Sequence, residues 1–206
     1  MQTMNEDEYY TIEEPAEGIY KEKGSRFLAF AYPVFSQDEI KDILGQIEKK
    51  YHDARHRCYA WKLGMTEDNF RANDDGEPSG TAGRPIYGQI LSNNLTNVLV
   101  VVVRYFGGIK LGTGGLIVAY KTATADAFAN ASIVMRKVMD TYDVRFSYAA
   151  MNDVMKVMKD ANLTMQNQQF DLSCSFRVAM RQGMSESVVE RLQSIESVEV
   201  EFISSI

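Results

Sequence analysis

Apolar residues at strand and helix spacing divide the first part of the chain into mixed elements. Leu99 to Val103 are apolar without interruption, which predicts a strand buried on both faces. Ser36 and Glu39 have the spacing of a capping box, so a helix should begin there and end near Lys50. The remaining predictions are extended chain over 19–32, a strand over 57–63, an irregular loop over 70–84, a short helix over 85–91, a strand over 98–105 and a helix over 113–131.

From about residue 134 the pattern changes to alternation of apolar and polar residues. Tyr142, Val144 and Phe146 alternate with polar side chains, which is typical of an antiparallel strand with one face in water. A methionine-rich helix over 153–161, strands over 163–170 and 171–180, a helix around 188–195 and a strand around 198–202 should follow. This is the element order of a ferredoxin-like domain, so we predict an α+β protein with a domain boundary near residues 132–138.

The 28 acidic residues are unevenly distributed along the chain. Six of them, and no basic residue, lie within the first 17 positions, so we expect residues 1–17 to form a solvated acidic tail. The other positions contain 22 acidic and 22 basic side chains. The formal net charge of −6 therefore neither favours nor excludes a polyanionic partner.

Composition narrows the class of protein further. The 206 residues are 45% hydrophobic, which is enough for two separate cores. Cys58 and Cys174 lie far apart, so they predict neither a disulfide framework nor a zinc site. The N-terminus is acidic rather than signal-like, and no segment approaches the roughly 20 apolar residues of a membrane helix. We therefore expect a cytoplasmic protein that does not contact a membrane.

The segment from 78 to 125 contains no acidic residue and is rich in glycine. Gly107 and Gly108 should end the buried strand, because glycine readily adopts positive φ. Thr113 should then cap a helix that begins near Gly114, and the free N–H groups of a helix start favour an anion. We predict that a phosphate or a nucleic acid binds to this segment and to nearby basic residues. The alternative is a turn that serves only to pack the helix closely on the sheet.

The predicted phosphate or nucleic-acid contacts are Arg55, Arg57, Arg84, Arg104, Tyr105, Gly107, Gly108, Lys110, Gly112, Thr113, Gly114, Gly115 and Lys121. Arg104 is the most informative of them. A positive charge that follows five apolar residues requires either a buried carboxylate or an anionic ligand. If the role of Arg104 is structural, we expect Asp74 or Asp75 to be its partner.

Three blocks of the chain resemble the bacterial YigZ-like branch of the IMPACT family: Asp53 to Trp61, Asp74 to Gly83 and Arg104 to Gly115. The resemblance implies a ribosomal protein S5 domain 2-like domain over 18–133. A ferredoxin-like domain over 138–206, similar to domain V of elongation factor G, should follow it. The implied partners are structured RNA or the ribosome, and the implied role is in translation regulation. Eukaryotic members regulate translation through an additional N-terminal domain, for which we expect no room in this chain.

An enzyme is the second hypothesis. Asp74, Asp75 and Glu77 place three carboxylates within four positions, which is a set able to hold Mg²⁺. With a phosphate at the helix start, this predicts a Mg²⁺-dependent enzyme acting on a phosphorylated small molecule. Outside this hypothesis we expect no cofactor, and we assign no catalytic residue. The chain lacks the P-loop and dinucleotide-binding motifs.

Two further interpretations concern other residues. His56 and Cys58 would share one face of a strand as a base and a thiol, but nothing near them in sequence orients the pair, so a core cysteine is favoured. The second domain could instead present an open sheet face to a protein partner. Four methionines would then form its adaptable surface or, as we favour, belong to the core: Met151, Met155, Met158 and Met165.

Overall fold

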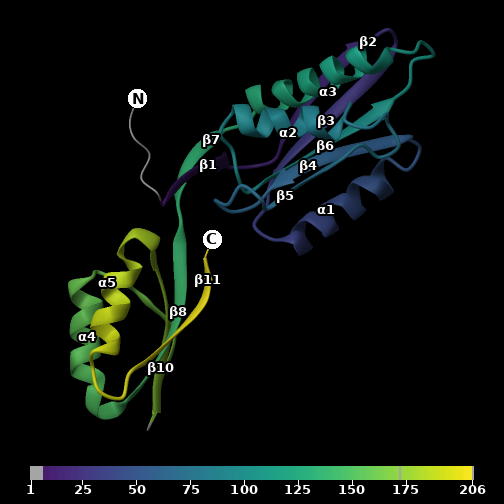
Figure 1. The fold of residues 1–206 in the computed structure, drawn as a ribbon. Coiled ribbons are helices and arrows are strands. Elements are labelled where there is room, and N and C mark those ends of the chain that lie inside the picture. The colour runs from purple at the N-terminus through teal and green to yellow at the C-terminus, as the bar shows by residue number, and fades with distance from the viewer. Residues whose placement is uncertain (1–6, 172, 206) are drawn as a thin grey trace. The chain divides into compact units, whose positions relative to one another are not determined.

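The computed structural model describes residues 7–171 and 173–205, and these form two compact units. The first unit runs from Tyr9 to Arg136. The second contains the chain from Lys137 onward, together with Asp7 and Glu8. Both units combine helices with antiparallel sheets (Figure 1). Within the described ranges, no helix is both long enough and apolar enough to cross a membrane.

The first unit is built on a five-stranded sheet in the order β2-β3-β6-β4-β5. All neighbouring strands in it are antiparallel. Helix α1 packs on one face of the sheet, and α2 and α3 pack on the other (Figure 1). The elements are β2 (Ala16–Glu22), β3 (Ser25–Pro33), α1 (Gln37–Lys50), β4 (His56–Lys62), β5 (Phe70–Asn73), α2 (Gly83–Ser92), β6 (Val98–Tyr105) and α3 (Gly112–Ala129).

Strand β6 lies at the centre of this sheet and contributes to two cores. Val98, Val100 and Val102 pack against α2 and α3, because alternate side chains of a strand point to the same face. Leu99, Val101 and Val103 pack on the α1 side. All six are fully buried, which confirms the predicted central strand. Arg104 and Tyr105 continue this alternation, so their side chains leave the strand on opposite faces of the sheet.

The glycine at the end of β6 has a packing role. A Cβ on Gly107 would lie 1.9 Å from the carbonyl carbon of Gly24, in the turn between β2 and β3. The Gly107 N–H also donates a hydrogen bond to the Ser25 hydroxyl, at 3.1 Å. The packing interpretation therefore holds for this glycine, and a side chain here would push the β2–β3 turn away from the sheet.

Two helix starts differ in how well the sequence predicted them. Ser36 caps α1 as expected, since its hydroxyl accepts a hydrogen bond from the Glu39 N–H. Helix α3 begins at Gly112, after Leu111, rather than near Gly114. Thr113 lies inside the first turn instead of capping it, and no side chain of the described residues caps this helix.

The segment over 70–84, predicted as an irregular loop, begins with strand β5.

The second unit has the four-stranded sheet order β11-β8-β10-β9, with two helices on one face. Its elements are β8 (Met139–Ser147), the 3-10 turn η1 (Tyr148–Ala150), α4 (Met151–Asp160), β9 (Met165–Phe170), β10 (Ser173–Arg181), α5 (Gln182–Gln193) and β11 (Glu199–Ser205). Val144 and Phe146 are buried while Arg145 is exposed, which confirms the predicted alternation in β8. Met158 is buried under α4, while Met155 on the same helix is exposed. Met151 and Met165 pack against the same core, so the favoured core location holds for three of the four methionines and is wrong for Met155.

The first described residues do not form a solvated tail. Glu8–Ile12 is strand β1, which pairs with β7 (Ile133–Lys137) in a two-stranded sheet. Tyr9 and Ile12 are buried, and Arg181 holds the Asp7 carboxylate in an ion pair. The prediction is wrong for residues 7–17, because a few apolar side chains between the acids are enough to bury a short strand. The other part of the predicted tail, including Glu6, lies outside the described residues.

Candidate phosphate-binding cleft

The topology of the first unit brings three separate sequence blocks to one cleft of about 460 Å³. The start of β4 is antiparallel to the end of β6, with His56 opposite Arg104. The loop after β5 and the segment that enters α3 complete the walls. The lining residues are Arg55, His56, Glu77, Pro78, Arg104, Phe106, Lys110, Leu111, Gly112, Thr113 and Leu116.

An ion pair forms the floor of the cleft. Arg104 Nη1 donates to Glu77 Oε1 at 2.6 Å, and the two side chains are only 8% and 3% exposed. The Tyr120 hydroxyl donates to the same Glu77 oxygen at 2.8 Å. Cys58 Sγ lies 3.3 Å from that hydroxyl. Burial raises the pKa of the Tyr120 hydroxyl and of the Cys58 thiol, so both groups stay protonated beneath the ion pair.

Arg104 is not fully satisfied by this pair. Its Nε is buried and makes no hydrogen bond to any residue that the structure describes. The guanidinium carbon lies 5.4 Å from the centre of the Phe27 ring and 5.6 Å from the centre of the Phe106 ring, and aromatic rings offer no strong acceptor. A buried donor without an acceptor costs about 1–3 kcal/mol. An anionic oxygen in the cleft is the kind of group that would satisfy such a donor.

The start of α3 supplies further donors. This 18-residue helix has no acidic residue in its first turn, and none of the described side chains caps it. Its first N–H groups and the positive end of its dipole therefore remain open to an anion. The start of α2 is different, because the Asp74 carboxylate accepts hydrogen bonds from the backbone there. Of the two helix starts, the one at the cleft is the one left open.

The three predicted metal ligands are engaged elsewhere. Asp74 accepts from the N–H groups of Gly80, Ala82 and Gly83, at 2.8 to 2.9 Å. Asp75 accepts from the Arg57 N–H at 2.7 Å, and Glu77 is paired with Arg104. No three His, Cys, Asp or Glu side chains in the described ranges are grouped so that they could hold a metal ion. The predicted Mg²⁺ cluster is therefore wrong, because each carboxylate serves a different set of donors.

The acid that pairs with Arg104 also differs from the one expected. Glu77 is the partner, whereas we expected Asp74 or Asp75. Burial alone would raise the pKa of Asp74, but its three backbone donors and the nearby Arg84 hold that pKa below its ordinary value. Asp74 thus stays ionised as the cap of α2 and leaves the cleft to Glu77.

The structure brings together part of the predicted contact set. Arg55, Arg104, Lys110, Gly112 and Thr113 line the cleft. Gly107 and Gly108 lie in the turn between β6 and α3, and Gly114 and Gly115 lie in the first turn of α3. Arg84 and Lys121 are exposed on α2 and α3, apart from the residues that line the cleft.

Two predicted contacts lie on the wrong face of the sheet. Arg57 donates from Nη1 to the carbonyl oxygens of Tyr51 and Ala54, on the side covered by α1. The Tyr105 hydroxyl donates to Asp53 at 2.8 Å, on the same side. Strand alternation explains both cases, because each is adjacent in sequence to a residue that does line the cleft.

His56 is a cleft residue that the sequence analysis did not assign to a phosphate site. Its Nδ1 lies 2.8 Å from the Asp75 carbonyl oxygen, which can only accept, so Nδ1 must hold the proton. This contact fixes the ring at the cleft wall and leaves Nε2 as its second polar atom. The signal for His56 was the alternation with Cys58, but its position opposite Arg104 depends on strand register.

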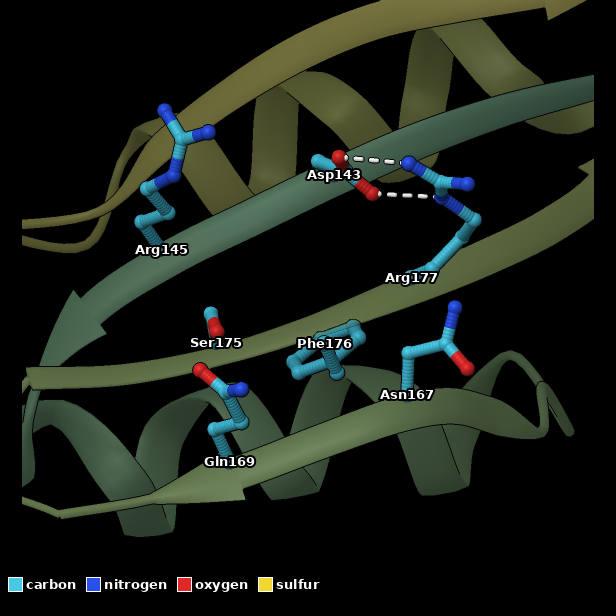
Figure 2. Close-up of a pocket in the computed structure, with 7 residues that line it drawn as sticks. All are labelled: Asp143, Arg145, Asn167, Gln169, Ser175, Phe176 and Arg177. Carbon is cyan, nitrogen blue, oxygen red and sulfur yellow. Dashed lines mark hydrogen bonds and ion pairs between the residues drawn. The ribbon is translucent and has the colours of Figure 1, made fainter.

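A second hollow, on the sheet of the second unit, has a different character. Figure 2 shows its lining residues Asp143, Arg145, Asn167, Gln169, Ser175, Phe176 and Arg177. Arg177 donates to both carboxylate oxygens of Asp143, at 2.7 and 2.8 Å (Figure 2). Arg145 lies 3.3 Å from Glu201 on the neighbouring strand. Both arginines face a carboxylate and are partly or largely exposed to solvent, whereas Arg104 is buried with an unpaired Nε, so the cleft of the first unit is the better candidate for an anion.

Comparisons with known proteins are consistent over most of the chain. Residues 23–128 match the family model described as the Impact N-terminal domain, and every cleft residue lies in this range. The IMPACT family member YvyE of Bacillus subtilis is 32% identical over 82% of this chain and 77% of its own length. YigZ of Escherichia coli is 29% identical over 81% of this chain and 82% of its own length. A crystal structure described as that of a hypothetical protein has a TM-score of 0.73, at 25% identity, covering 97% of this chain and 99% of that one.

Proposed function

The chain belongs to the IMPACT family, and we propose that it acts in translation by binding the phosphates of structured RNA, free or in the ribosome, at the cleft of the first unit. The unsatisfied Arg104 is the observation that supports this proposal most directly. The guanidinium has one nitrogen held by Glu77 and a buried Nε without an acceptor, and an anion bound at the cleft floor would supply that missing acceptor. The open start of α3 offers donors to the same anion.

Charge at the cleft favours the same ligand. Arg55, Arg104 and Lys110 are basic, and Glu77 is the acidic residue among those that line the cleft. Because Glu77 neutralises Arg104, the lining keeps a net excess of two positive charges on residues near the rim. Phosphate contacts from such residues dominate the affinity of proteins for nucleic acids and make it dependent on salt.

We propose a fold assignment that agrees with this role. The sheet order β11-β8-β10-β9 in the second unit, with helices after its first and third strands, supports assigning that unit to the ferredoxin-like class. We assign the first unit to the ribosomal protein S5 domain 2-like class, so the pair would resemble domains IV and V of elongation factor G. This assignment supports a link to the ribosome by analogy of fold, whereas the cleft supports it through chemistry.

The test is the binding of a fluorescein-labelled RNA hairpin, followed by anisotropy from about 50 to 300 mM salt. Wild-type protein should bind with an affinity that falls steeply with salt. Lys110→Ala and Arg55→Ala should each weaken binding and reduce the salt slope by about one. Lys121→Ala removes the same charge from α3 outside the cleft, so it should bind like wild type.

Two results would contradict the proposal. Folded wild-type protein that does not bind the hairpin at low salt would remove the RNA-binding function. Equal losses in Lys110→Ala and Lys121→Ala would show that a diffuse positive surface, rather than the cleft, binds the phosphates.

A further inference from the structure

We propose that the cleft receives a phosphate monoester, as found on a nucleotide or at the end of an RNA strand, with the nucleobase against Phe106. This inference rests on the proposed function and specifies its ligand. It distinguishes an end of the strand from the internal phosphodiesters that most backbone-binding surfaces contact.

The buried floor of the cleft favours the terminal phosphate of a strand over an internal phosphodiester. Arg104 and Glu77 lie at the floor with side chains that are more than nine-tenths buried. Behind them, Tyr120 and Cys58 are fully buried and contact the ion pair or each other, so core side chains lie beneath the cleft. An internal phosphodiester has a nucleotide on each side, so a strand that reached Arg104 would have to enter the cleft and leave it again. A terminal phosphate reaches the floor with a nucleotide on one side only.

The donors also match a monoester better than a diester. A phosphate monoester has three terminal oxygens and a charge of about −1.5 to −2 at pH 7. The cleft offers the ammonium of Lys110, the N–H groups at the start of α3 and Arg55 at the wall, and at its floor the Nε of Arg104 lacks an acceptor. The excess of two positive charges therefore balances a monoester. An internal phosphodiester would present one negative charge and two terminal oxygens to the same donors.

Phe106 makes a nucleotide the favoured monoester. Its side chain is 50% exposed although it is large and apolar, and it lines the cleft beside the phosphate donors. Arg104 lies 5.6 Å from the ring centre. Exposed aromatic rings stack on nucleobases in proteins that bind single strands and ends. The volume of about 460 Å³ is also within the usual range of small-molecule sites, about 300–1,000 Å³.

The experiment is calorimetric titration of the full chain with a short single-stranded RNA of one sequence in three forms. These have a 5′-phosphate, a 3′-phosphate or hydroxyls at both ends. AMP, adenosine and inorganic phosphate complete the set of probes. A phosphorylated end should bind at least about tenfold more tightly than the hydroxyl form, because it adds charge-assisted hydrogen bonds. The two phosphorylated forms identify which end enters the cleft.

Matched variants test whether the preference for a phosphorylated end arises at the cleft. Lys110→Ala should abolish the preference for a phosphorylated end, whereas Lys121→Ala should retain it. Phe106→Ala should weaken AMP binding several-fold and leave the binding of inorganic phosphate unchanged, because it removes the stacking surface but no donor. Arg104 is unsuitable for this test, since its loss would leave Glu77 buried without a partner.

The outcomes separate this inference from the proposed function. Equal affinity for phosphorylated and hydroxyl ends, with salt-dependent hairpin binding intact, would overturn the monoester site and leave RNA binding standing. Failure of the hairpin and of all single-stranded forms to bind would overturn both. Binding of phosphorylated ends and AMP without hairpin binding would support the monoester site and refute the recognition of structured RNA.

Discussion

The ion pair at the cleft floor should make a large contribution to the stability of the first unit. Arg104 and Glu77 are joined at 2.6 Å, and their side chains are 8% and 3% exposed. Replacing either residue by alanine leaves the other charge buried without a partner, which typically costs about 3–5 kcal/mol. Glu77→Ala also removes the acceptor of the Tyr120 hydroxyl, adding about 1 kcal/mol. Such losses are a large part of the roughly 5–15 kcal/mol that stabilises a domain.

A double-mutant cycle tests the coupling between the two charges. Glu77→Leu with Arg104→Met replaces the pair by apolar side chains and leaves no buried charge. The double variant should therefore cost less than either single substitution. The coupling energy should be at least about 2 kcal/mol, as expected for groups in direct contact.

Urea unfolding followed by tryptophan fluorescence is the appropriate assay. The chain contains one tryptophan, Trp61, which is buried on β4 of the first unit. Its signal therefore reports on the unit that contains the ion pair. Single substitutions that cost less than about 1 kcal/mol, or losses that simply add in the double variant, would refute the inference that the two charges are buried and coupled.

Three further predictions concern the Asp74 cap on α2, the two buried cysteines and the close approach at Gly107. The lowered pKa of Asp74 means that its cap on α2 stabilises the fold above about pH 4 and is lost as the pH falls through the folded-state pKa. Asp74→Asn should cost about 0.5–2 kcal/mol at pH 7 in urea unfolding and nothing well below pH 4, and an equal cost at both pH values would contradict this. Cys58 and Cys174 are fully buried, so Ellman's reagent should titrate no thiol in the native protein and two in urea; rapid native labelling would show that these sites open. Gly107→Ala should cost at least about 1–3 kcal/mol in urea unfolding, because its Cβ would overlap Gly24. Gly114→Ala, where nothing lies within 4 Å, is the matched control and should be neutral or stabilising; equal effects would argue against the close approach.

Periodicity predicted the elements that bury large apolar faces. The central strand was expected over 98–105 and is β6 at those residues, because six consecutive apolar side chains fill two cores. The capping box at Ser36 likewise located the start of α1. Strand β1 was missed because acidic residues surround its few apolar side chains, and composition outweighed the short pattern. Strand β5 has only four residues, too few for alternation to show.

The cleft was predictable only where its residues are consecutive in the chain. Lys110, Gly112 and Thr113 follow Arg104 closely, so the glycine-rich segment identified them together. Arg55 and His56 reach the same cleft through the antiparallel register of β4 with β6, which no local pattern specifies. The choice of the acid that pairs with Arg104 depends on a tight turn in which Asp75 and Gly76 both have positive φ.

The contact that stabilises the cleft floor also prepares it for a ligand. Glu77 holds one nitrogen of Arg104, and the guanidinium lies within about 6 Å of the centres of two aromatic rings, so its remaining donors keep a fixed direction without a ligand. Binding then avoids most of the entropy that ordering a long side chain costs. Stability and binding should therefore separate in the double variant Glu77→Leu with Arg104→Met. It should remain folded, and it should lose the preference for a phosphorylated end, because the donors are gone while the core is filled. Retention of that preference would place the phosphate on the rim residues alone.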